Sequence, residues 1–132
     1  MFGKEKMPPL KSLIATGTRL QGDVWFEDGL RIDGEVKGNI IGSQDKPSVL
    51  VIGESAKITG EITAAHVIVN GHVDGPVLAH RLLELQPKAV VTGDVNYKAI
   101  ELHLGARVTG RLCPTPDAGE EKPPLKLAAS QG

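Results

Sequence analysis

The feature that most constrains the fold is a short motif, aliphatic–x–Gly–x–aliphatic, that recurs along the middle of the chain. It occurs eight times, whereas roughly one occurrence is expected by chance for this composition. The occurrences are L-Q-G-D-V at 20–24, I-D-G-E-V at 32–36, V-K-G-N-I at 36–40, I-T-G-E-I at 58–62, V-N-G-H-V at 69–73, V-D-G-P-V at 73–77, V-T-G-D-V at 91–95 and V-T-G-R-L at 108–112. Six motif glycines form a column with spacings of 16, 22, 15, 18 and 17 residues: Gly22, Gly38, Gly60, Gly75, Gly93 and Gly110. The middle of the chain is therefore built from internal repeats.

The repeat unit predicts a β-solenoid. A unit of 15–18 residues is too short for a pair of helices or a propeller blade. Within each unit aliphatic and polar residues alternate, as in L-R-I-D-G-E-V at 30–36, which is the period of a strand rather than of a helix. We therefore expect an all-β fold, a triangular solenoid of about six turns with three short strands in each and glycines at the tight corners. An antiparallel sandwich with regularly spaced turns is the alternative.

The charge balance and the single cysteine exclude several classes of protein. Fifteen Lys and Arg residues are opposed by 16 Asp and Glu residues, and without a basic excess we expect no nucleic-acid partner. Cys113 alone can form neither an internal disulfide nor a multi-cysteine metal site. No apolar run reaches the ~18 residues that cross a bilayer, and no signal-peptide core follows the N-terminus. We expect a cytoplasmic protein.

Proline divides the chain into three parts. Six of the nine prolines lie near the two ends, where the missing backbone donor argues against strands. We predict a disordered N-terminal tail at 1–12, a β-helix domain at 13–112 and a disordered proline-rich C-terminal tail at 113–132. Neither tail has enough apolar residues to offset the entropy of ordering. The widest repeat spacing contains the polar stretch G-S-Q-D-K-P-S at 42–48, which we expect to be a loop inserted into one turn.

The motif also predicts a core ladder and a polymer interface. One aliphatic residue from each repeat should point inward and stack on its equivalents: Val24, Ile40, Ile62, Val77, Val95 and Leu112. A solenoid leaves unpaired strand edges at both ends unless a cap covers them, and only L-K-S-L-I-A at 10–15 offers a candidate cap. We therefore expect Val108 and Leu112, in the last turn, to contact another copy of the chain. The residues alone do not show whether this end contacts the C-terminal end or the N-terminal end of the next copy.

The repeated x-G-[DE]-[IV] turns, the stretch N-Y-K-A-I-E-L-H-L-G-A-R-V-T-G-R-L at 96–112 and the short tails around a central domain resemble the bactofilins, a family of bacterial cytoskeletal proteins. The resemblance covers the expected core at 13–112 and the tail architecture. It implies a single-stranded, right-handed β-helix that polymerises end to end, without nucleotide, into non-polar filaments on the inner face of the cytoplasmic membrane. It also implies a scaffolding role in cell shape or morphogenesis, with cell-wall-modifying enzymes among the partners.

The first residues predict a contact with the membrane. Met1 and Phe2 can enter the headgroup region of a bilayer while Lys4 and Lys6 meet anionic lipid. An early Phe in a short N-terminal tail is also similar to many bactofilins. We expect these four residues to hold the protein at the inner leaflet of the cytoplasmic membrane. An ordinary solvated N-terminus is the alternative.

We expect no catalytic, cofactor-binding or metal-binding residues. His66, His72 and His103 alternate with aliphatic residues, which places them on the outer faces of strands, and their spacing is not that of a zinc site. The stretch at 52–62 is similar to a hexapeptide repeat, so an acyltransferase with a histidine base is one alternative, and a non-polymerising binding module is another. Four acidic residues recur beside motif glycines and are expected to be structural: Asp23, Glu35, Glu61 and Asp94.

Overall fold

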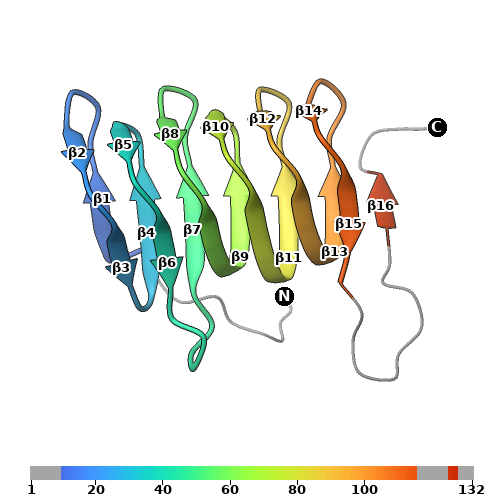
Figure 1. Ribbon diagram of the computed structural model, residues 1–132, viewed down its shortest axis with the longest axis horizontal. Coiled ribbons are helices and arrows are strands. Elements are labelled where there is room, and N and C mark those ends of the chain that lie inside the picture. Colours follow the sequence, from blue (N-terminus) through green and yellow to red (C-terminus); the bar gives the residue numbers. More distant parts are fainter. Residues whose placement is uncertain (1–9, 116–124, 128–132) are drawn as a thin grey trace.

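The computed structural model describes residues 10–115 and 125–127, and every regular element in these residues is a β-strand. The strands wind around one axis and each turn lies beside the next, which gives a β-solenoid of about six turns (Figure 1). All of the strand pairs are parallel. An antiparallel sandwich would pair strands of opposite direction, so that alternative is wrong. The prediction of an all-β solenoid is confirmed.

Three faces surround the core. The first face contains β1 (Ser12–Ile14), β4 (Gly29–Ile32), β7 (Val49–Ile52) and the second halves of β9 (Ile62–Val69), β11 (Val77–Leu85) and β13 (Val95–Leu102). The second face contains β2 (Arg19–Gln21), β5 (Glu35–Lys37), β8 (Lys57–Thr59), β10 (His72–Asp74), β12 (Val90–Thr92) and β14 (Arg107–Thr109). The third face contains β3 (Val24–Phe26), β6 (Ile40–Gly42), the first halves of β9, β11 and β13, and β15 (Leu112–Pro114).

Aliphatic side chains from all three faces fill the solenoid, and on each face one inward column extends through all six turns. The third-face column is Val24, Ile40, Ile62, Val77, Val95 and Leu112, in continuous strand register. The second-face column is Leu20, Val36, Ile58, Val73, Val91 and Val108. The first-face column is Ile14, Ile32, Ile52, Val69, Leu85 and Leu102. In every column the four middle members are at most 2% exposed, whereas the first and last members are more exposed, so the core is open at both ends.

The column glycines allow the turns to stack closely. All six have a positive φ, between 124° and 153°, a range that favours glycine. A Cβ atom on Gly75 would lie 2.2 Å from the carbonyl oxygen of Gly60 in the preceding turn. A side chain at this corner would therefore meet both a disfavoured backbone conformation and the backbone of its neighbour. This is why the motif retains glycine at the same place in each turn.

Strand pairing continues past the predicted end of the domain. The domain was expected to end at Leu112; β15 extends to Pro114, and within the expected C-terminal tail β16 (Leu125–Leu127) pairs in parallel with β13. Strand β15 covers only Val95–Tyr97 of β13 and leaves the edge at Ile100–Leu102 open. The alternating L-K-L segment has the period of a strand and occupies that edge. The rest of the expected tails, and with them the expected membrane-targeting residues, lie outside the described residues.

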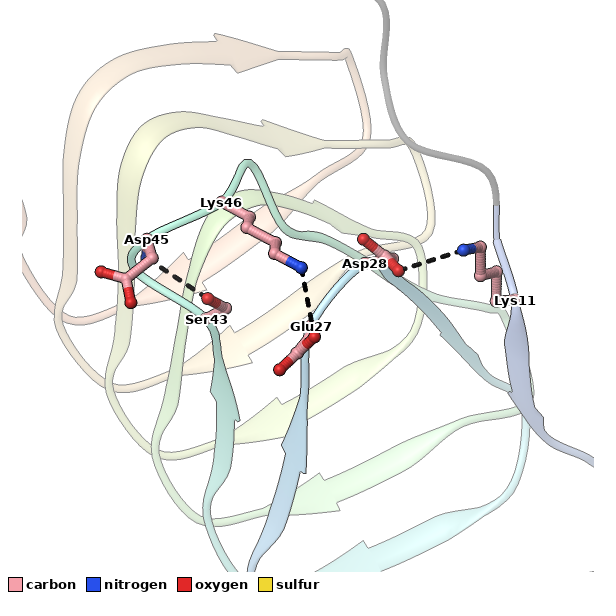
Figure 2. Close-up of polar contacts among 6 residues, drawn as sticks. All are labelled: Lys11, Glu27, Asp28, Ser43, Asp45 and Lys46. Carbon is pink, nitrogen blue, oxygen red and sulfur yellow. Dashed lines mark hydrogen bonds and ion pairs between the residues drawn. The ribbon is translucent and has the colours of Figure 1, made fainter.

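The inserted polar stretch at 42–48 includes the loop between β6 and β7, which extends beyond the neighbouring corners (Figure 1). Ser48 is fully buried; its hydroxyl donates to the Ser43 carbonyl at 3.1 Å and accepts from the Ala65 N–H at 3.0 Å. The Asp45 N–H donates to the Ser43 hydroxyl at 3.2 Å (Figure 2). The loop is therefore fixed to the following turn by a buried, fully bonded serine.

Two surface ion pairs lie near the same corner. Lys46 Nζ lies 3.4 Å from Glu27 Oε1, and Lys11 Nζ lies 3.2 Å from Asp28 Oδ2 (Figure 2). Exposed pairs of this kind contribute at most about 1 kcal/mol each. They join the loop and the residue before β1 to the residues that follow β3.

Candidate functional site: the two ends of the solenoid

The N-terminal end of the solenoid is a set of open strand edges. Strands β1, β2 and β3 each pair with one strand of the second turn, and no described residue pairs with their other edges (Figure 1). Leu20 (37% exposed) heads an inward column at this end, whereas the exposed Leu13 (59%) and Trp25 (72%) lie on the outer faces of the first turn, in register with Arg31 and Ile41. Leu20 is in register with the fully buried Val36 and is exposed because its column ends in this turn. Sequence reasoning did not single out these residues, although their place in the first turn was a usable signal.

The C-terminal end has two open edges of the same kind. Strands β14 and β15 pair only with β12 and β13 among the described residues. The expected interface residues Val108 and Leu112 are the last members of the second-face and third-face columns. Leu112 is 44% exposed and Val108 is half-buried, whereas Val91 and Val95, one turn earlier, are fully buried. The structure thus places both residues at the opening of the core.

Backbone groups at the C-terminal end include both donors and acceptors. On the third face each turn donates to the next, as the Val95 N–H does to the Arg111 carbonyl at 2.9 Å. The equivalent N–H of Leu112 has no further turn to donate to in the described chain. On the second face the direction is reversed, and the Ala89 carbonyl accepts from the sixth turn at 2.9 Å. The equivalent carbonyl of Ala106 faces the open end, so this end can both donate to and accept from another strand edge.

Two of the four acidic residues beside the motif glycines, Asp23 and Asp94, link neighbouring turns. Asp23 Oδ1 accepts the Asn39 N–H at 2.9 Å, and Asp94 Oδ1 accepts the Arg111 N–H at 2.9 Å. Each bond crosses from one turn to the next at the glycine corner. A side-chain oxygen that accepts a backbone N–H in a turn stabilises that turn. These carboxylates therefore support the stacking of corners.

The histidines occupy different surroundings on the outer surface. His72 is exposed, whereas His66 and His103 are half-buried. His103 Nε2 lies 3.2 Å from Glu84 Oε2, and one ligand atom from each of Glu84, Glu101 and His103 lies within 4.8 Å of the others. Glu84 and Glu101 belong to different turns and are brought together by strand register. Sequence reasoning therefore missed this group, whose residue types are ones that divalent cations accept.

Tyr97 lies buried near the C-terminal opening. Burial raises the pKa of its phenol, and the neighbouring Cys113 raises it further. Cys113 is half-buried in β15, one residue after Leu112. Ionisation of the phenol is therefore disfavoured at this position near the end of the core.

The comparison with known families agrees with this architecture. The family model for bactofilin, described as polymer-forming cytoskeletal, matches residues 12–113, well over half of the chain. The matched range begins at β1 and ends in β15, so it includes both open ends. No curated protein and no solved structure gives a significant match. Among the described residues there is no helix with the length and apolar character that a membrane span requires.

Proposed function

We propose, from the premise that the chain belongs to the bactofilin family of polymer-forming cytoskeletal proteins, that it assembles end to end into filaments without a nucleotide. The observation that carries the proposal is that the core is closed on its three faces and open at both ends. The middle members of each column are at most 2% exposed, whereas Leu20 and Leu112 are exposed only because their columns stop. Another copy of the chain supplies the missing turn.

Apolar burial provides most of the driving force for such a joint. Burying a side chain of the size of Leu contributes about 1.5–3 kcal/mol. The N-terminal end opens on the first members of the three columns, Ile14, Leu20 and Val24, and a joint between two N-terminal ends buries these side chains from both copies. Each strand-edge hydrogen bond adds about 1 kcal/mol. These contributions together exceed the lower estimates, about 4 kcal/mol, of the entropy cost of association.

Contacts between like ends give a filament without polarity. This arrangement is what the family resemblance implies, and the backbone is compatible with it. The N-terminal end offers the Arg19 N–H and the Asp23 carbonyl, which are equivalent to groups that bond between turns inside the solenoid. A two-fold contact pairs the donor of one copy with an acceptor of the other.

We propose that these filaments lie on the inner face of the cytoplasmic membrane. There they scaffold membrane- or wall-associated processes that determine cell shape, and cell-wall-modifying enzymes are among their clients. Met1, Phe2, Lys4 and Lys6 form the membrane contact. Each lysine near an anionic surface contributes about 1 kcal/mol, so one copy binds weakly. A filament presents many copies of this segment, and multivalency makes the attachment firm.

Negative-stain electron microscopy of the purified chain tests the assembly. Filaments should form in buffer without any nucleotide, and they should persist after treatment with a nucleotide-hydrolysing enzyme. A chain that stays monomeric at high concentration would contradict the proposal and favour a non-polymerising binding module.

A further inference from the structure

We infer that the C-terminal strand β16 is an internal competitor for the polymer contact, because it occupies a strand edge that the next copy of the chain needs. The inference rests on the proposed function and concerns the control of its C-terminal joint. The edge in question is that of β13 at Ile100–Leu102.

The register shows what β16 replaces. Along the first face, Leu83 is in register with Ile100, and Leu85 is in register with Leu102. Strand β16 continues both rows, with Leu125 opposite Ile100 and Leu127 opposite Leu102. It therefore takes the position that a first-face strand of a seventh turn would take. An added subunit would place its own strand at this same position.

The two ends of the solenoid consequently differ. At the N-terminal end no described residue pairs with the outer edges of β1, β2 and β3, one on each face. At the C-terminal end the outer edges of β14 and β15 have no partner in the described part of the chain, but the first face is covered by β16 (Figure 1). One edge cannot pair with two strands at once. A complete C-terminal joint therefore requires β16 to leave, whereas the N-terminal joint has no such requirement.

The size of β16 suits a strand that exchanges. It has three residues and pairs only with β13 among the described elements. So short a pairing opens at little free-energy cost compared with unfolding of the solenoid. Assembly is therefore stepwise: N-terminal joints form first and give dimers, and displacement of β16 by the C-terminal end of another dimer extends the filament.

The test compares the critical concentration for assembly of the full chain with that of three variants. A truncation that removes residues 125–132 deletes β16, and a matched truncation that removes 128–132 retains it. The third variant, Lys126→Pro, keeps the length and removes the backbone donor of β16 that the register turns toward β13, as the His103 N–H is turned toward Leu85 one turn earlier. Sedimentation and light scattering measure assembly, and circular dichroism checks that the solenoid is folded.

Loss of β16, by truncation at 125 or by Lys126→Pro, should lower the critical concentration about fivefold. Removal of 128–132 should leave it unchanged. Equal critical concentrations for all four chains would overturn the competitor role while leaving the proposed function in place. A higher critical concentration without β16 would also overturn it, because β16 would then belong to the joint. Failure of every chain to assemble would overturn the proposed function and this inference together.

Discussion

Replacing Val77 with Asp should unfold the solenoid. Val77 is fully buried and lies in register between Ile62 and Val95, which are fully buried as well. Losing its apolar burial removes about 1.5–3 kcal/mol. Burying a carboxyl group without a hydrogen-bond partner costs about 2–7 kcal/mol more. The sum is comparable with the whole stability of a typical domain, about 5–15 kcal/mol.

The matched control is Leu78→Asp, the same change at the next residue. Leu78 is half-buried and points away from the core, because successive residues of a strand face opposite sides. Urea unfolding followed by circular dichroism should show a folded Leu78→Asp chain and a Val77→Asp chain without β-signal. If Val77→Asp keeps its β-signal and unfolds at the same urea concentration as the control, the assignment of Val77 to an inward column is wrong.

Three further changes test other parts of the account. Gly75→Ala should destabilise the solenoid by several kcal/mol more than Gly22→Ala in urea unfolding. Both glycines have a positive φ, but of the two only Gly75 would place a Cβ against the preceding turn. Equal losses of stability would mean that backbone conformation alone requires the glycine. Deleting residues 2–7 should release filaments from vesicles of anionic lipid in a co-sedimentation assay while leaving assembly intact, and unchanged co-sedimentation would remove the lipid role of this segment. The pKa of Tyr97 in the folded state is raised above its ordinary value of 10.0, so ionisation of Tyr97 opposes folding. The melting temperature should therefore fall as the pH rises above about 10. Tyr97→Phe should reduce that fall, and an unchanged fall would contradict the role of Tyr97.

Most of the fold could be predicted from the repeat, because each motif glycine marks one corner of the solenoid. The spacing between column glycines varies from 15 to 22 residues, yet their stacking places Val24, Ile40 and the residues that follow them in one register. The length differences are absorbed outside the corner, as in the loop within 42–48. Strand β11 similarly carries a register shift between Ala79 and Leu82 relative to both neighbours. No motif marks such a local bulge, because only the neighbouring strands define it.

The ends of the solenoid were only partly predictable. Leu112 is the last residue of the final motif, so its place at the C-terminal opening follows from counting the repeats. Strand β16 did not follow, because L-K-L lies among prolines and charged residues and becomes a strand only where β13 offers an open edge. The contact between Glu84 and His103 was likewise invisible, since it depends on which residues of successive turns face each other. Local pattern predicts strands, whereas contacts across turns require the register.

The most direct test of end-to-end assembly is the largest species formed by Leu112→Arg. Leu112 is 44% exposed at the C-terminal opening, so an Arg side chain there reaches water in the free molecule and the solenoid stays folded. A joint at that end would have to desolvate the charge at a cost of several kcal/mol. The control is Thr92→Arg, which adds the same charge to the outer surface of the second face, one turn before the last. Circular dichroism should show a preserved β-signal for both variants. Light scattering should then find dimers, joined by their N-terminal ends, as the largest species of Leu112→Arg. Thr92→Arg should still form filaments. Long filaments of Leu112→Arg would contradict the account, because the C-terminal end would then not be a polymer contact.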